Sequence, residues 1–148
     1  MSFQETSLWS STSTPIHSFA GRPLPAQADV VVIGGGYTGL SAALQLAKHG
    51  ASVTLLERES LGWGASSRNG GMILPGLKHG AGELIRSFGN ARARELYAAS
   101  VKSIECVETI VEQEKIECDY ARRGSFDAAF KPAHFEHLKQ SQEILARE

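Results

Sequence analysis

Residues 29–57 read DVVVIGGGYTGLSAALQLAKHGASVTLLE, and their pattern predicts a β-α-β unit. The β-branched run at 29–33 is typical of a parallel strand that is buried on both faces. Residues 38–49 carry small side chains at helical spacing, and Gly50 follows at the usual position of a left-handed helix cap. A second strand is expected at 52–57.

The turn between the first strand and the helix matches the motif G-x-G-x-x-G. Gly34 permits a tight turn, Gly36 lets the backbone approach a pyrophosphate, and Gly39 allows the helix to pack closely on the strand. The start of the helix offers N–H groups and a positive dipole end to phosphates. Glu57 ends the second strand, where a carboxylate can accept hydrogen bonds from ribose hydroxyls. The unit therefore predicts a dinucleotide site rather than a glycine turn without a ligand.

The motif alone does not separate NAD from FAD. Arg58 would suit the 2′-phosphate of NADP, but the neighbouring carboxylate of Glu57 would repel that phosphate.

The glycine-rich loop that follows, at 60–82, is too long for an idle connection and is expected to be functional or mobile. Arg68 can neutralise pyrophosphate charge, and Ser66 and Ser67 can donate hydrogen bonds to its oxygens. Glycines at 70–71 leave room for a flat ring system. A surface loop with an incidental arginine is the alternative.

Three segments, at 29–43, 55–57 and 64–71, resemble the amino-terminal part of FAD-dependent amine and amino-acid oxidoreductases. This is the superfamily of D-amino-acid oxidase, glycine oxidase and sarcosine oxidase. The sequences YTGLS and ASSRNGG are most similar to those of gamma-glutamylputrescine oxidases and their relatives. The resemblance is strong over 29–72 and looser over the rest of the chain.

The resemblance implies that FAD is the cofactor and assigns its contacts. The pyrophosphate would be held by Gly34, Gly36, Tyr37, Thr38 and Gly39, the adenosine ribose by Glu57 and the Arg58 backbone, and the pyrophosphate, ribityl chain and isoalloxazine edge by Ser66, Ser67, Arg68, Asn69, Gly70, Gly71 and Met72. Residues 60–72 contain no His or Cys, so a covalent flavin link from this loop is excluded and non-covalent FAD is expected.

The resemblance also implies oxidation of a C–N bond in a small-molecule amine or amino acid, with hydride passing to the flavin and an imine left to hydrolyse. No catalytic side chain is identified, and His134 and His137 lack a third ligand for a metal. Members of this superfamily are several hundred residues long, so the chain resembles an amino-terminal fragment that is inactive alone. The alternative is a free-standing, non-enzymatic module that binds FAD or NAD.

The fold class expected is α/β, with an incomplete Rossmann-type βαβ unit followed by a helical segment at the beginning of an α+β substrate domain. The expected parts are a leader at 1–28, a cofactor-binding part at 29–89 and the start of the substrate domain at 90–148.

Prolines disfavour a helix in the leader, although Trp9, Ile16 and Phe19 could attach it to a surface. Near the carboxyl end, a helix is expected from Asn90 to about Lys115, a possible strand at 124–130 and a helix from Pro132.

A net charge of −1 and a charged fraction of 21% give no basis for a nucleic-acid or membrane partner. The two cysteines suit a reducing compartment, and the first residues do not read as a secretory signal. A cytoplasmic location is expected, and the oligomeric state is not predicted.

Overall fold

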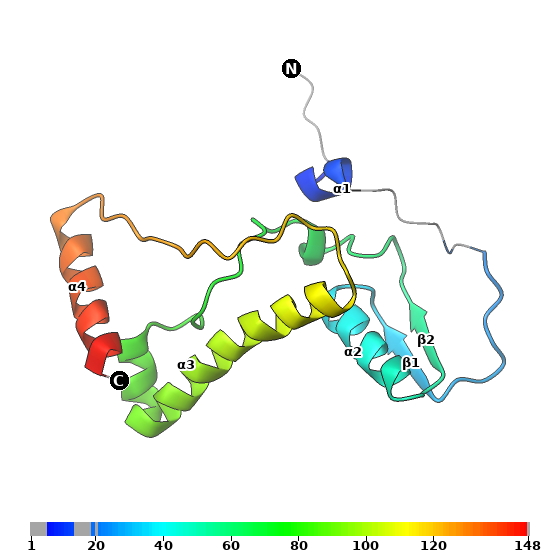
Figure 1. The fold of residues 1–148 in the computed structure, drawn as a ribbon, viewed down its shortest axis with the longest axis horizontal. Coiled ribbons are helices and arrows are strands. Elements are labelled where there is room, and N and C mark those ends of the chain that lie inside the picture. Colours follow the sequence, from blue (N-terminus) through cyan, green and yellow to red (C-terminus); the bar gives the residue numbers. More distant parts are fainter. Residues whose placement is uncertain (1–5, 14–18, 20, 148) are drawn as a thin grey trace, which may run out of the picture. The chain divides into compact units, whose positions relative to one another are not determined.

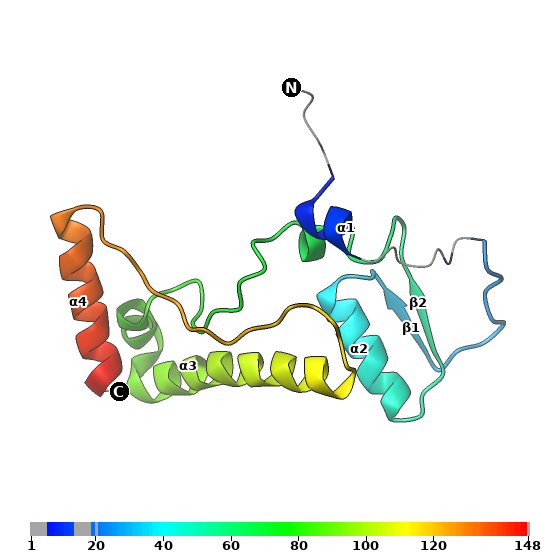
Figure 2. The same cartoon turned by 45° about the horizontal axis from the view of Figure 1, so that its top comes forward.

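A computed structural model of the chain describes residues 6–13, 19 and 21–147. It divides into two compact units, Met1–Met72 and Ile73–Glu148. The first unit contains α1 (Leu8–Thr12), β1 (Val30–Ile33), α2 (Tyr37–Lys48), β2 (Val53–Leu56) and the 3₁₀ helix η1 (Ala65–Ser67). The second unit contains α3 (Ala81–Gln113) and α4 (Pro132–Arg147). Figures 1 and 2 show these elements along the chain.

The predicted β-α-β unit is present. β1 and β2 pair in parallel, in a register that runs from Val30 opposite Val53 to Ile33 opposite Leu56. α2 joins the two strands and lies along them in both views (Figures 1 and 2). Gly50 follows the helix with a φ of 87°, the left-handed conformation that its position predicted.

The expectation that the first strand is buried on both faces is wrong for the described residues. Val30 and Val32 are half-buried, whereas Val31 and Ile33 have exposed fractions of 54% and 86%. A Cβ on Gly39 of α2 would lie 3.3 Å from Val32 Cγ1, so the half-buried set faces the helix. β-branched side chains are compatible with a strand buried on both faces. In the described residues, however, only the face of β1 that lies toward α2 is covered.

The leader forms a short helix, contrary to the expectation from its prolines. α1 ends at Thr12, before the first proline of the sequence at position 15. Ser7 caps it, because its Oγ accepts a hydrogen bond of 3.1 Å from the Ser10 N–H. Ile16 lies outside the described residues.

The helix expected after Asn90 is present as the second part of a longer element, α3, which begins at Ala81. Gly89 interrupts it with a φ of 76° and a ψ of 164°, so α3 consists of two helical parts joined at a kink. The helical part before Gly89 was not predicted, because the helical period that predicts the second part does not continue through Gly89. The buried side chains of α3 are Leu84, Ala93, Ser100 and Ile104.

The expected strand at 124–130 does not form. These residues are irregular and exposed, and Phe126 and Phe130 have most of their surface in solvent. α4 begins at Pro132 as predicted, in the first-turn position that proline tolerates. Its Ile144 packs near Gly82 of α3, where an added Cβ would lie 3.4 Å from Ile144 Cδ1. Among the described helices, none has the length and apolar character that crossing a bilayer requires.

Candidate dinucleotide-binding site

The glycine turn holds α2 against the end of β1. A Cβ added to Gly39 would lie 1.9 Å from the carbonyl oxygen of Gly34, a separation that no real side chain adopts. Gly34 itself has a φ of 101°, which favours glycine. The turn therefore needs glycine at both positions for backbone reasons, and this brings the first N–H groups of α2 next to the end of the strand.

Glu57 at the end of β2 is tied to this turn. Its Oε2 accepts a hydrogen bond of 2.6 Å from the Gly35 N–H, and its Oε1 accepts one of 3.0 Å from the Glu59 N–H. These bonds, that from Glu59 above all, lower the pKa of Glu57 from its usual value of 4.5. The carboxylate is thus charged at neutral pH and fixed beside the glycine turn.

Gly35 is a site residue that the sequence motif left out, because the pattern G-x-G-x-x-G leaves its position free. It is the middle of three successive glycines and is buried. An added Cβ would lie 2.6 Å from Leu61 Cδ2 and 3.2 Å from Glu57 Oε2. Its carbonyl accepts a hydrogen bond of 2.9 Å from the Gly62 N–H, so Gly35 joins the turn to the loop after β2.

The loop after β2 returns to the start of α2 through Ser66. The Ser66 Oγ accepts a hydrogen bond of 3.0 Å from the Tyr37 N–H, in the first turn of the helix. The cap residue Gly36 has no side chain for this task, and a Cβ there would lie 3.0 Å from the same Oγ. A hydroxyl that accepts a hydrogen bond can still donate one through its own proton. Ser66 is therefore positioned at the helix end that the motif assigns to phosphate.

Asn69 organises the rest of this loop. Its Nδ2 donates to the carbonyls of Ala65 and Ser66 at 3.1 and 3.0 Å, and its Oδ1 accepts from the Gly71 N–H at 2.8 Å. The side chain thus takes the place of backbone pairing across the turn. The sequence predicted Asn69 as a cofactor contact, and the structure shows that its amide bonds to the loop itself.

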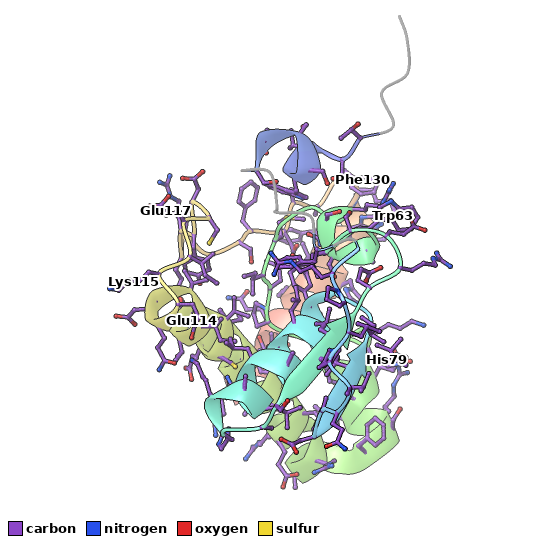
Figure 3. The ribbon with its side chains drawn as sticks, turned by 90° about the vertical axis from the view of Figure 1, so that its right-hand side faces the viewer. Trp63, His79, Glu114, Lys115, Glu117 and Phe130 are labelled. Atoms are coloured by element: carbon purple, nitrogen blue, oxygen red, sulfur yellow. The ribbon has the colours of Figure 1, made fainter. Side chains whose placement is uncertain are left out.

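Arg68 lies on the indole of Trp63, which is labelled in Figure 3. Its Cζ is 4.8 Å from the ring centroid, and its Nε donates to the Trp63 carbonyl at 3.0 Å. A guanidinium has five N–H donors, so this arrangement leaves most of its capacity for an anion. The Arg58 side chain pairs with Glu59 at 3.1 Å.

The remaining predicted contacts lie around this centre. Tyr37 and Thr38 are exposed in the first turn of α2, Ser67 is half-buried in η1, and Gly70 and Met72 are exposed.

This set of groups fits FAD. The glycine turn brings the backbone close where a pyrophosphate needs no intervening side chain, and α2 begins there with its dipole. Ser66 and Arg68 add a hydroxyl and a positive charge. Glu57 supplies the carboxylate that a ribose requires.

Residues 29–148 match the family model described as FAD dependent oxidoreductase. The chain belongs to this family. The match confirms the family that the sequence resembled and FAD as its cofactor.

Curated relatives match over part of the chain. It is 41% identical over 95 residues to the probable oxidoreductase OrdL of Haemophilus influenzae, covering 64% of this chain and 22% of that protein. It is 40% identical over 100 residues to the gamma-glutamylputrescine oxidoreductase of Escherichia coli, covering 68% of this chain and 24% of that protein. The chain thus spans about a quarter of the length of these relatives. No solved structure matches it significantly.

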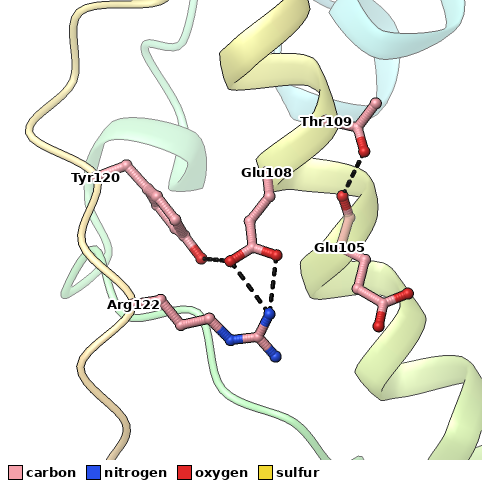
Figure 4. A network of polar contacts seen from close by, with 5 residues as sticks. All are labelled: Glu105, Glu108, Thr109, Tyr120 and Arg122. Carbon is pink, nitrogen blue, oxygen red and sulfur yellow. Dashed lines mark hydrogen bonds and ion pairs between the residues drawn. The ribbon is translucent and has the colours of Figure 1, made fainter.

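A separate polar cluster lies in the second unit (Figure 4). The Tyr120 hydroxyl donates to Glu108 Oε1 at 2.7 Å, and Arg122 pairs with Glu108 Oε2 at 3.0 Å. The hydrogen bond to Glu108 raises the pKa of Tyr120 from its usual value of 10.0. The cluster attaches the irregular segment after α3 to that helix.

Proposed function

We propose that this chain binds the adenosine and pyrophosphate parts of FAD without a covalent link, in an oxidoreductase that oxidises a C–N bond of a small amine or amino acid. The observation that supports this proposal most directly is the hydrogen bond of 2.6 Å from the Gly35 N–H to Glu57 Oε2. It fixes the acid of the second strand beside the phosphate turn of the first, which is the pairing of groups that a dinucleotide needs. The substrate class is supported by the relative named for gamma-glutamylputrescine, which is an amine.

In this proposal the chain's own residues bind and orient the cofactor. The start of α2 and the Ser66 hydroxyl hold the pyrophosphate, and Arg68 balances its charge. Glu57 accepts hydrogen bonds from the adenosine ribose. FAD, when bound, supplies the acceptor for hydride from the carbon that carries nitrogen. No described residue is assigned to the reacting atoms of the substrate.

We also propose that residues 29–89 form the cofactor part and residues 90–148 the beginning of a substrate domain. The described residues supply two parallel strands, whereas a mononucleotide-binding half has three. We therefore expect the 148-residue chain alone to bind FAD and not to turn over an amine.

The test is the visible absorption of the purified chain after incubation with FAD and desalting. We expect the parent to retain a flavin band, and Gly36→Val and Glu57→Gln to lose it. Glu59→Gln is the matched control, because it makes the same change two residues away, on a side chain that pairs with Arg58. A parent without flavin would contradict FAD binding by this chain, and equal retention by Glu57→Gln would contradict the ribose assignment. Displacement of FAD by NAD would favour a non-enzymatic dinucleotide-binding module.

A further inference from the structure

The amino-terminal helix α1 lies against the loop at 65–71. Trp9 makes the contact: its indole Nε1 donates a hydrogen bond of 2.8 Å to the carbonyl oxygen of Asn69. These residues are sixty positions apart in the sequence, so this hydrogen bond closes a long loop of the chain. Trp9 is exposed, with an exposed fraction of 41%, so the contact covers part of its surface and leaves the rest open to water.

The indole also rests on Gly71. A Cβ on Gly71 would lie 2.5 Å from Trp9 Cζ2 and 3.0 Å from its Cη2. Gly71 has a φ of 71°, so the position favours glycine both for its backbone and for the ring above it. Gly71 is one of the two glycines that were predicted to leave room for a flat ring system, and here the indole of Trp9 lies over it.

The residues that Trp9 contacts belong to a connected set of hydrogen bonds. Asn69 bonds to Ala65, Ser66 and Gly71, and the Ser66 Oγ accepts the N–H of Tyr37 at the start of α2. A group that immobilises Asn69 and Gly71 therefore also restricts Ser66. This links the leader to the start of α2 through contacts within one unit of the chain.

We propose that Trp9 is a positioning residue for the cofactor loop: α1 holds residues 65–71 in the conformation that places Ser66 at the start of α2. Trp9 acts through the loop, by way of its contacts with Asn69 and Gly71. The inference rests on the proposed function in one respect, namely that this loop faces FAD. The order of the loop without cofactor does not depend on that function and can be measured separately.

The experiment uses the full 148-residue chain with Trp9→Ala, Trp9→Phe and the matched control Ser11→Ala. Ser11 is exposed on the same helix, and its hydroxyl bonds to the Leu8 carbonyl of that helix. Two quantities are measured: amide hydrogen exchange of residues 65–71 without cofactor, and the Kd for FAD from flavin fluorescence. Far-UV circular dichroism checks that each variant keeps its helix content.

We expect Trp9→Ala to accelerate exchange across 65–71 and to raise the Kd for FAD about tenfold, which corresponds to about 1.4 kcal/mol. Trp9→Phe keeps a ring over Gly71 but loses the N–H donor, so it should lie between the parent and Trp9→Ala. Ser11→Ala should match the parent. Adding Gly71→Ala should do less harm in the Trp9→Ala background than in the parent, because the ring that obstructs the new Cβ is gone.

Exchange in Trp9→Ala that equals the parent's would overturn the proposal. An unchanged Kd would do so too, and a lower one would show that the indole competes with FAD for this space. If the parent binds no FAD, the proposed function fails and the exchange rates alone decide whether α1 orders the loop.

Discussion

Gly39→Ala should destabilise the first unit although it places a better helix former inside α2. The added Cβ would lie 1.9 Å from the Gly34 carbonyl oxygen, 3.1 Å from the Gly34 carbonyl carbon and 3.3 Å from Val32 Cγ1. Two of these atoms are backbone at the end of β1 and cannot rotate away. The helix must therefore move from the strand by about 1 Å before the contact becomes tolerable, and that movement opens the packing between α2 and the sheet.

Two opposing terms set the magnitude. Alanine in place of glycine stabilises a helix interior by about 1 kcal/mol. Forcing an extra carbon into a packed site costs about 1–3 kcal/mol, and occasionally more. Because the obstructing atoms are backbone, we take the upper end, and a net loss of about 2 kcal/mol in the free energy of unfolding is expected.

The two tryptophans of the chain, Trp9 and Trp63, both lie in the first unit, so their fluorescence during urea unfolding reports on that unit. Gly80→Ala is the control: its φ of −67° and ψ of 162° suit alanine, and no atom lies within 4 Å of the added Cβ. It should leave the tryptophan transition unchanged. A Gly39→Ala protein that unfolds at the same or a higher urea concentration than the parent would refute the close approach of α2 to β1.

Three further results are expected. Gly50→Ala should lower the free energy of unfolding of the first unit by about 1 kcal/mol, because the φ of 87° is unfavourable for alanine; a parent-like urea midpoint would contradict this. The lowered pKa of Glu57 should stabilise the fold above about pH 4.5, with the contribution lost as the pH falls through the folded-state pKa; Glu57→Gln should flatten this acid dependence of the melting temperature. The raised pKa of Tyr120 acts in the opposite direction, so its contribution is present below about pH 10 and lost as the pH rises through the folded-state value. Tyr120→Phe should remove that alkaline loss, as followed by circular dichroism of α3, and an unchanged alkaline profile would argue against the bond to Glu108.

The β-α-β unit could be predicted from sequence because its signals are local. Four successive β-branched residues, the glycine turn and Gly50 each restrict the backbone where they stand. The family resemblance rested on the same residues, and the family match confirms it. The helical part of α3 before Gly89 was not predicted, and the strand expected at 124–130 does not form because these residues have no strand to pair with among the described residues.

The candidate site was predictable in its residue types but not in their partners. The spacing of glycines and an acid indicates a dinucleotide, yet it does not show that Gly35 binds Glu57 or that Arg68 stacks on Trp63. Trp9 was predicted as a surface attachment, and its partner could not be predicted because sixty residues separate the two. Such long-range contacts depend on how the chain closes, which residue spacing does not encode.

The uncovered face of β1 has a consequence for aggregation of the 148-residue chain. Val31 and Ile33 present β-branched side chains to water on a strand whose second edge is unpaired among the described residues. A short apolar edge of this kind is a template for cross-β growth between molecules. The solubility of the chain is therefore expected to depend on this strand. Val31→Lys would place a charge on the exposed face and should raise the concentration at which the chain precipitates, without changing the side chains that face α2.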